Sequence, residues 1–196
     1  VRTAGGVGGA EERGHRARLD GGTHGVMVGA RREGAKSGVA RQLADREDEK
    51  EYVALVWGLL HTRRRIDAPL GGDPVNRQKM STRARRARSA VTRVTGTERL
   101  RGLTLAKLTI ATGRQHQIRV HLNSIGHPVV GDAVYGGVRR HLEADHRVLA
   151  TLDRPFLHAY RIAFPPPRDG RRVEFTAPLP DDLQTIVDAL RERRDR

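Results

Sequence analysis

The alternation of apolar and polar positions along the chain predicts a set of β-strands. Lys50 to Trp57 is rich in β-branched and aromatic residues and stops at Gly58, which is typical of a strand. Leu103 to Ile110 alternates in the way expected of a strand that is buried mainly on one face. Further strands are predicted at residues 26–28, 91–95, 156–164 and 172–175.

Apolar residues at helical spacing predict three helices. Residues 33–47 are polar with a narrow apolar stripe, and residues 115–125 carry Ile118, Leu122 and Ile125 on one face. Residues 182–193 form the last predicted helix, with Asp181 as its expected N-cap. Strands outnumber helices and do not alternate strictly with them, so the pattern predicts an α+β fold.

The length of 196 residues suffices for one ordinary domain with a hydrophobic core. Residues 1–14 are dominated by glycine and small residues without apolar periodicity, and we expect them to form a flexible tail. Residues 15–196 are predicted to form the folded domain.

The charge balance points to a polyanionic partner. Lys and Arg total 37 against 23 acidic residues, which gives a formal net charge of +14. Nucleic acid is the commonest partner of such a chain, and arginine, which dominates here, suits bidentate contacts to phosphate. A GC-rich coding sequence would produce the same arginine bias, so the positions of the arginines are better evidence than their number.

Many of the basic residues follow a break in the hydrophobic pattern. Residues 67–90 contain prolines and glycines without periodicity, and we expect a long surface loop there. Residues 77–101 carry nine basic residues and one acidic residue, a net charge of +8. The charge pattern alone is compatible with a solvated surface and with a nucleic-acid interface.

Several kinds of chemistry are excluded by what the sequence lacks. Without cysteine it has no disulfide scaffold, zinc–thiolate site, iron–sulfur cluster or catalytic thiol. His116 and His121, five residues apart, would point to different faces of a helix, so we predict no metal site. The longest apolar run, residues 52–60, is too short to span a bilayer. We therefore expect a cytoplasmic protein without a membrane partner.

Asp20 stands on a glycine-rich turn, residues 18–25, that leads into the first predicted strand. Such a turn can present a carboxylate outward for chemistry. Aspartate and glycine are also ordinary turn residues, and the pattern alone leaves both interpretations open.

Two segments stand out, GRQHQIRVHL at residues 113–122 and GHPVVGDAVYG at residues 126–136. Together with residues 18–25 and 49–58, and in this order, they resemble the RluA family of RNA pseudouridine synthases. The resemblance extends over residues 16–185 and is most specific at residues 112–122 and 126–136. It implies a pseudouridine synthase fold, with a central, mainly antiparallel mixed sheet flanked by helices and loops. It also implies an enzyme that isomerises specific uridines in structured RNA, with large-subunit ribosomal RNA as the first expectation and transfer RNA as the alternative. The other matching segments are residues 66–70, 79–80, 157–160 and 175–180.

The resemblance assigns the chemistry to three residues. The family cuts the bond between C1′ and N1 of uridine, rotates the base and rejoins it through C5, and its essential aspartate maps to Asp20. A carboxylate can stabilise or trap the positive charge that develops on the sugar. Tyr52 maps to the tyrosine that stacks on the flipped base and is proposed to help in proton removal. Arg119 maps to the basic residue that pairs with the catalytic carboxylate and keeps it ionised.

The resemblance and the charge pattern together predict RNA contacts and a pocket. Arg18 is expected to contact RNA near the flipped base, and the basic loop is expected to position folded RNA through its backbone. Ile118 and Leu122 are expected to pack the pocket floor. No cofactor or metal is implied because the reaction is an isomerisation, and we expect a monomer. The predicted RNA-binding residues are Arg18, Arg77, Lys79, Arg83, Arg85, Arg86, Arg114 and His116.

The chain departs from the family pattern in places. Ala17 stands where the family has His, His24 where it has Ser, and Gln115 where it has Thr. Residues 1–14 do not resemble the strand that precedes the aspartate motif in the family, and we would expect loss of that strand to lower stability and to endanger activity. The rival interpretations are a degenerate, non-catalytic RNA-binding protein with the synthase fold and, more weakly, a basic ribosome-associated structural protein.

Overall fold

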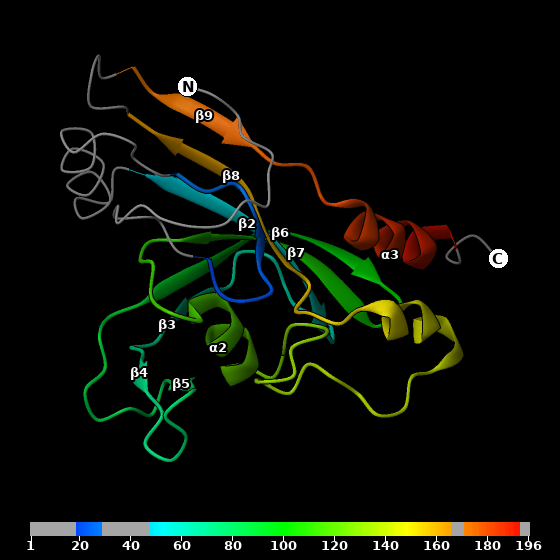
Figure 1. Ribbon diagram of the computed structural model, residues 1–196, viewed down its shortest axis with the longest axis horizontal. Helices are drawn as coiled ribbons and strands as arrows, with labels where there is room; N and C mark the ends of the chain where they lie inside the picture. Colours follow the sequence, from blue (N-terminus) through cyan, green and yellow to red (C-terminus); the bar gives the residue numbers. More distant parts are fainter. Residues whose placement is uncertain (1–18, 29–47, 166–170, 193–196) are drawn as a thin grey trace, which may run out of the picture.

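The computed structural model describes residues 19–28, 48–165 and 171–192. Within these ranges a seven-stranded sheet has the order β1-β8-β2-β7-β6-β3, with β9 also paired to β8 (Figure 1). The pairing of β1 with β8 is parallel and the others are antiparallel, which confirms the predicted α+β fold with a mixed, mainly antiparallel sheet. The strands are β1 (His24–Gly25), β2 (Glu49–Trp57), β3 (Arg65–Asp67), β6 (Val91–Leu100), β7 (Leu103–Ile110), β8 (Leu157–Phe164) and β9 (Val173–Thr176).

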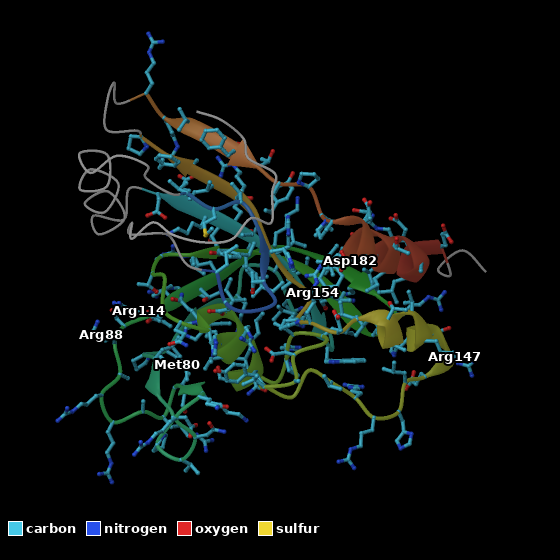
Figure 2. All side chains as sticks on the ribbon, in the orientation of Figure 1. Met80, Arg88, Arg114, Arg147, Arg154 and Asp182 are labelled. Carbon is cyan, nitrogen blue, oxygen red and sulfur yellow. The ribbon has the colours of Figure 1, made fainter. Side chains whose placement is uncertain are left out.

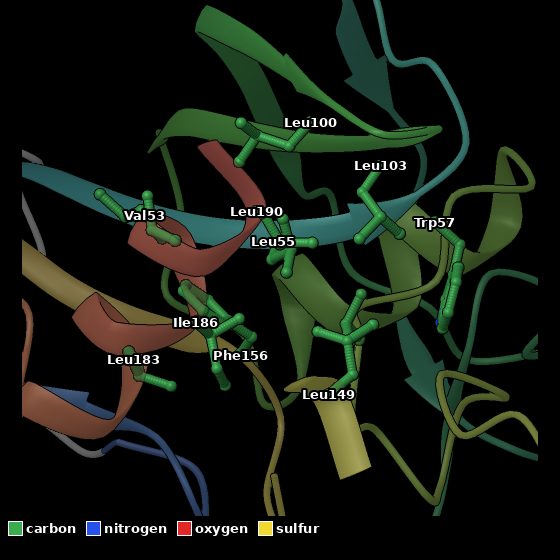
Figure 3. Close-up of a cluster of buried hydrophobic side chains, with 12 residues drawn as sticks. Val53, Leu55, Trp57, Leu100, Leu103, Leu149, Phe156, Leu183, Ile186 and Leu190 are labelled. Carbon is green, nitrogen blue, oxygen red and sulfur yellow. The ribbon is translucent and has the colours of Figure 1, made fainter. Parts of the chain in front are cut away.

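The two faces of the sheet carry separate cores because side chains alternate along each strand. On β2, Leu55 and Trp57 belong to a core that also contains residues of α3 (Asp181–Glu192) and of the 3₁₀ helix η1 (Ala144–Thr151), as Figure 3 shows. Ala54 and Val56 belong to a second core shared with α2 (Gln117–Ser124). The predicted strand 50–57 and the predicted alternation of residues 103–110 are therefore confirmed in β2 and β7, and the two cores place α2 opposite α3 across the sheet.

Strands β6 and β7 form a long hairpin whose first strand is longer than the sequence predicts. The pairing shifts register between Val94 and Gly96, and β6 continues to Leu100 beyond the predicted end at residue 95. A bulge places one extra residue in a strand and breaks its alternation. The hydrophobic pattern therefore stops at the bulge although the strand does not.

The predicted loop 67–90 contains a folded unit that we call the basic arm, residues 70–88. Leu70 and Arg88 close its base by exchanging two backbone hydrogen bonds of 2.8 Å. Two short strands, β4 (Gly71–Gly72) and β5 (Met80–Ser81), pair within it. The arm lies beside α2 and extends away from the sheet (Figure 1). Its inner side packs on a small core of Leu70, Ala90, Val120 and Tyr135, against which Met80 is placed.

Three predicted element boundaries are wrong, each for a local reason. The first strand is His24–Gly25 and not residues 26–28, because Gly25 has a φ of 127° and the chain leaves the sheet after it. Helix α2 begins at Gln117 because His116 has a φ of 55°. Asp181 is the first residue of α3 and not its N-cap, since the Pro180 carbonyl already accepts the first bonds. The predicted helix 33–47 and the predicted tail 1–14 lie outside the described residues.

Candidate active site

Asp20 stands on a tight turn that is fastened to the sheet. The amide of Thr23 donates to the Asp20 carbonyl at 2.9 Å, and Gly22 has a φ of 82°, which the third position of a type II turn requires. Strand β1 follows at once and pairs with β8, and the amide of Val26 donates to the Ala159 carbonyl at 2.9 Å. The glycine-rich sequence thus folds as a tight turn with Asp20 at its first position.

The carboxylate of Asp20 lies at the beginning of α2. The backbone N–H of His116, the N-cap residue, donates to Oδ1 of Asp20 at 3.3 Å. A helix N-terminus carries partial positive charge, which favours an ionised carboxylate there. His116 has left-handed backbone angles (φ 55°, ψ 18°), which are uncommon for a residue other than glycine and often mark functional sites.

A cavity of about 560 Å³ opens between the Asp20 turn, the sheet and the first turn of α2. Its size falls in the range of small-ligand pockets. Tyr52 of β2 and Ile118 of α2 line it together with Asp20, Arg114 and His116, so five of the predicted site residues meet in one cavity. Its walls are formed by Leu19, Asp20, Gly21, Thr23, Val26, Met27, Lys50, Tyr52, Ile110, Gly113, Arg114, Gln115, His116, Gln117, Ile118, Leu157, Ala159, Arg161 and Ile162.

Tyr52 is a neutral phenol at ordinary pH. Burial raises the pKa of its hydroxyl from 10.0 to about 12, and the negative charges of Asp20 and Asp48 add to the effect. A base stacked on Tyr52 would therefore meet an uncharged ring beside a carboxylate. A phenolate at this position is not available near pH 7, which weighs against Tyr52 acting as a strong base.

Arg119 is close to Asp20 but its hydrogen bonds go to a different carboxylate. Its Nε and Nη2 donate to Oδ2 and Oδ1 of Asp132 at 2.7 and 2.8 Å. Burial by itself would lower the pKa of Arg119, and the bonds to Asp132 with the charge of Asp20 raise it overall. The structure therefore replaces the expected direct pair with an arrangement in which Arg119 acts on Asp20 through space.

Asp132 and Tyr135 complete the surroundings of Arg119. Oδ1 of Asp132 also accepts the amides of Val134 and Tyr135 at 3.0 and 3.1 Å. The guanidinium lies 5.0 Å from the centre of the Tyr135 ring, close enough for a cation–π contact. Sequence reasoning gave neither residue a role, although the segment 126–136 was singled out. The available signal was an aspartate in a turn-forming loop, because such a side chain often accepts hydrogen bonds from the backbone amides that follow it.

The predicted pocket floor is half correct. Ile118 lines the cavity, whereas Leu122, one turn further along α2, is completely buried in the core shared with β2 and β7. Leu122 therefore supports Ile118 from behind and has no access to a ligand. Within the described residues the hydroxyl of Thr23, a cavity residue that the sequence did not suggest, is buried without a hydrogen-bond partner. It is available to a bound molecule.

The predicted RNA-binding residues fall into two groups. Arg77, Lys79, Arg83, Arg85 and Arg86 belong to the basic arm, where all but Lys79 are exposed. Within the described ranges these five side chains form no ion pair with an acidic residue. Arg114 and His116 line the cavity, and Nε of Arg114 donates to the Ser89 carbonyl, just beyond the arm (Figure 2). Arg18 lies outside the described residues.

Two further basic residues, Lys50 and Arg161, line the cavity beside Arg114, and neither was predicted as a site residue. Both charges are paired, Lys50 with Asp48 and Arg161 with Glu49, Glu51 and Glu174. Among the residues that the structure describes, no group of three or more histidine or acidic side chains could hold a metal ion. Over the same residues, no helix is long and apolar enough to cross a membrane.

Comparisons with known sequences agree with the geometry. The family model for RNA pseudouridylate synthase matches residues 9–124. Ribosomal large subunit pseudouridine synthase D of Zymomonas mobilis is 38% identical over 188 residues, which are 94% of this chain and 58% of that protein. An uncharacterized RNA pseudouridine synthase of Chloroflexus aurantiacus is 42% identical over 90% of this chain and 53% of its own length. The chain thus spans little more than half the length of these relatives.

Comparisons with solved structures lead to the same group. Human RNA pseudouridylate synthase domain containing 4 superposes with a TM-score of 0.74 at 25% identity, over 90% of this chain and 76% of that one. Human RNA pseudouridylate synthase domain containing 1 gives a TM-score of 0.67 at 28% identity, over 89% and 78%. The chain therefore belongs to the RNA pseudouridylate synthase family, as its resemblance to the RluA group predicts.

Proposed function

We propose that this chain isomerises uridine to pseudouridine in structured RNA, with large-subunit ribosomal RNA as its substrate. The observation that carries the proposal is the placing of Asp20, held by the His116 amide in the wall of a cavity that Tyr52 also lines. Several relatives, including those from Zymomonas mobilis and Nitrosomonas europaea, bear the name ribosomal large subunit pseudouridine synthase D. Their names support the choice of RNA.

The chemistry needs a carboxylate next to the sugar and a platform for the base. When the bond between C1′ and N1 breaks, positive charge develops on the sugar, and Asp20 stabilises or traps it. The base turns in the cavity, C5 bonds to C1′, the proton on C5 is released and N1 is protonated. Uridine and pseudouridine are isomers, so the reaction consumes no co-reactant, and the proposal includes no cofactor.

Tyr52 serves as the platform for the base in this proposal. Its ring lies in the cavity wall and its hydroxyl stays protonated because its pKa is about 12. An uncharged aromatic face stacks on a uracil without adding negative charge beside Asp20. The hydroxyl remains able to donate a hydrogen bond to the base while the base is detached.

Arg119 sets the electrostatic surroundings of Asp20. Its guanidinium is fixed in direction by Asp132, and its positive charge attracts the Asp20 carboxylate. A guanidinium held by two hydrogen bonds to Asp132 does not swing to Asp20 when the sugar becomes positive. The Asp20 carboxylate is then held by the His116 amide and not by the guanidinium.

The basic arm and Arg114 bind the RNA backbone in this proposal. Arg77, Arg83, Arg85 and Arg86 are exposed, and Arg114 lines the cavity. Contacts to phosphate position an RNA without reading its sequence, and they weaken as salt increases. We further propose that residues 15–196 act as one catalytic domain, as a monomer, in the cytoplasm.

The experiment is tritium release from ribosomal RNA transcripts labelled at C5 of uridine. C5 loses its hydrogen only when it becomes the glycosidic carbon, so release reports the isomerisation itself. We expect release with the wild-type chain, loss of at least about 100-fold in Asp20→Asn, and unchanged RNA affinity in that variant. Asp145→Asn is the matched control, because Asp145 is an exposed aspartate on the distant η1, where it pairs with Arg101.

Two results would reject the proposal. A folded wild-type chain that binds several transcripts tightly and releases no tritium would favour the degenerate RNA-binding protein. Release that persists in Asp20→Asn would remove Asp20 from the chemistry. Use of transfer RNA transcripts in the same assay decides between the two classes of substrate.

A further inference from the structure

Tyr135 lies where the basic arm meets the beginning of α2. Its ring is buried in the small core with Leu70 and Val120, and Met80 of the arm packs against that core. Its edge also faces the His116 imidazole, with ring centroids 5.6 Å apart at an angle of 77°. One side chain thus touches both the arm and the residue that holds Asp20.

The Tyr135 hydroxyl forms two hydrogen bonds whose directions can be worked out. The backbone N–H of Met80 donates to its oxygen at 2.9 Å, and Nδ1 of His116 lies 2.7 Å from the same oxygen. Burial lowers the pKa of His116, so the imidazole is neutral near pH 7. Because the oxygen already accepts from the Met80 amide, we assign the hydroxyl proton to the bond with Nδ1. This assignment places the imidazole proton on Nε2.

The same residue continues the connection to the catalytic carboxylate. The backbone N–H of His116 donates to Oδ1 of Asp20 at 3.3 Å, and the left-handed backbone of His116 aims that N–H. Three hydrogen bonds therefore run without a gap from the arm to Asp20, through Met80, Tyr135 and His116.

We propose that Tyr135 is a positioning residue that couples the seating of RNA on the basic arm to the orientation of His116 and Asp20. The inference rests on the proposed function. Phosphate contacts on the arm fix the position of Met80, which holds the Tyr135 hydroxyl and, through it, the His116 ring and amide. RNA that engages the arm thereby favours the arrangement in which Asp20 is ready to react.

The test combines Tyr135→Phe with a variant of the arm. Phenylalanine keeps the ring packing and the contact with Arg119 and removes only the hydroxyl. We expect the single-turnover rate at saturating RNA to fall about tenfold in Tyr135→Phe while RNA affinity changes by less than about threefold. Tyr160→Phe, on a partly buried tyrosine in the core on the α3 face, is the matched control with an unchanged rate.

The arm variant is Arg85→Gln with Arg86→Gln. In the wild-type background it lowers the saturated rate as well as affinity, because the arm no longer holds Met80 in place. In the Tyr135→Phe background it lowers RNA affinity, and the rate at saturating RNA stays equal to that of Tyr135→Phe alone. Arg147→Gln, an exposed arginine on η1 far from the arm in Figure 2, controls for the loss of charge. If the arm variant and Tyr135→Phe each lowered the saturated rate by a factor, and the two factors multiplied in the combined variant, the coupling would be overturned.

A second measurement needs no RNA. Nitrogen-15 NMR of the imidazoles, with the His116 signals assigned by His116→Gln, should show a proton on Nε2 in the wild type and mixed tautomers in Tyr135→Phe. An unchanged tautomer together with an unchanged rate overturns the inference. An inactive wild-type chain would instead overturn the proposed function, whereas an active chain that ignores Tyr135→Phe rejects only the coupling.

Discussion

Asp132 receives both hydrogen bonds of the Arg119 guanidinium, and the two side chains are 0% and 5% exposed. A buried bidentate pair fixes a guanidinium more firmly than a surface pair, but its formation has a large desolvation cost. The pair therefore fixes the position of the guanidinium and adds little to the stability of the fold. It holds a permanent positive charge behind the cavity wall, close enough to Asp20 for the two charges to interact.

Removal of one partner is expected to be severe. Asp132→Ala leaves the Arg119 charge buried and two backbone amides without an acceptor, and should lower the free energy of unfolding by about 3–5 kcal/mol in urea titrations. Glu98→Ala, which breaks the half-exposed pair with Arg191, should cost about 1 kcal/mol or less. A similar loss in both variants would mean that the buried pair is not held as described. Arg119→Met with Asp132→Leu removes the unpaired buried charge and should recover part of the stability, although the amides of Val134 and Tyr135 still lack an acceptor.

The fold could largely be predicted because strand alternation survives burial. In β7 the odd and even positions enter different cores, and the alternation of residues 103–110 records this. In β2 the residues 53–57 are all buried, and their β-branched and aromatic types predicted the strand. The pattern failed where a backbone irregularity intervened. The bulge at Val94–Gly96 hid half of β6, and the left-handed His116 moved the beginning of α2. Neither irregularity changes the hydrophobicity of the residues concerned.

The motifs predicted which residues form the site, but they did not predict the contacts between those residues. Asp20, Tyr52 and Ile118 meet as expected, because the motifs that contain them are placed by the sheet and by α2. Which carboxylate binds Arg119 depends on how the segment after Val130 returns beneath α2, and a single sequence does not record that path. Leu122 and Ile118 have the same helical periodicity, and only three-dimensional packing tells the cavity wall from the core.

Tyr52 should make stability depend on alkaline pH. Its folded pKa of about 12 lies above the unfolded value of 10.0, so the folded state holds the phenol proton more tightly. The contribution is fully present below pH 10 and is lost as pH rises toward 12. At pH 11 the wild type should have lost about 1 kcal/mol from this group. Between pH 8 and pH 11, denaturant titrations should show a smaller loss of unfolding free energy in Tyr52→Phe than in the wild type. Equal losses would mean that the Tyr52 hydroxyl is exposed to water.

His121 should make the base of the arm sensitive to acid. It is fully buried, accepts from the Thr92 hydroxyl at Nδ1 and donates from Nε2 to the Ala68 carbonyl at 2.9 Å. Burial lowers its folded pKa below the unfolded value of 6.5, so the unfolded chain binds the proton first. Stability should therefore fall as pH drops below 6.5.

Thermal melting at pH 7.5 and pH 5.5 tests this behaviour. The acid-induced drop in the melting midpoint should be smaller in His121→Gln, even though that variant is less stable at pH 7.5. His61→Gln, on an exposed turn, should show the same drop as the wild type. A drop that is unaffected by His121→Gln would assign the acid sensitivity to other groups.

Gly25 should be the most sensitive glycine near the site. Its φ is 127°, and a β-carbon added there would lie 2.2 Å from the Ala159 carbonyl oxygen. Gly25→Ala must therefore push β1 away from β8 and move the Asp20 turn that precedes it. Misplacing a reacting group by about 1 Å can cost about 100-fold in rate, and we expect at least that loss of tritium release. The melting midpoint should change little, because β1 is only two residues long.

Gly96→Ala is the matched control for this variant, since an added β-carbon there meets Lys107 at an ordinary 3.7 Å and the site is remote. Hydrogen exchange at the Val26 amide, which donates to Ala159 in the wild type, reports the pairing of β1 directly. Exchange should accelerate in Gly25→Ala and stay slow in Gly96→Ala. If Gly25→Ala kept full activity and a protected Val26 amide, then the attachment of β1 to β8 would not be what positions Asp20.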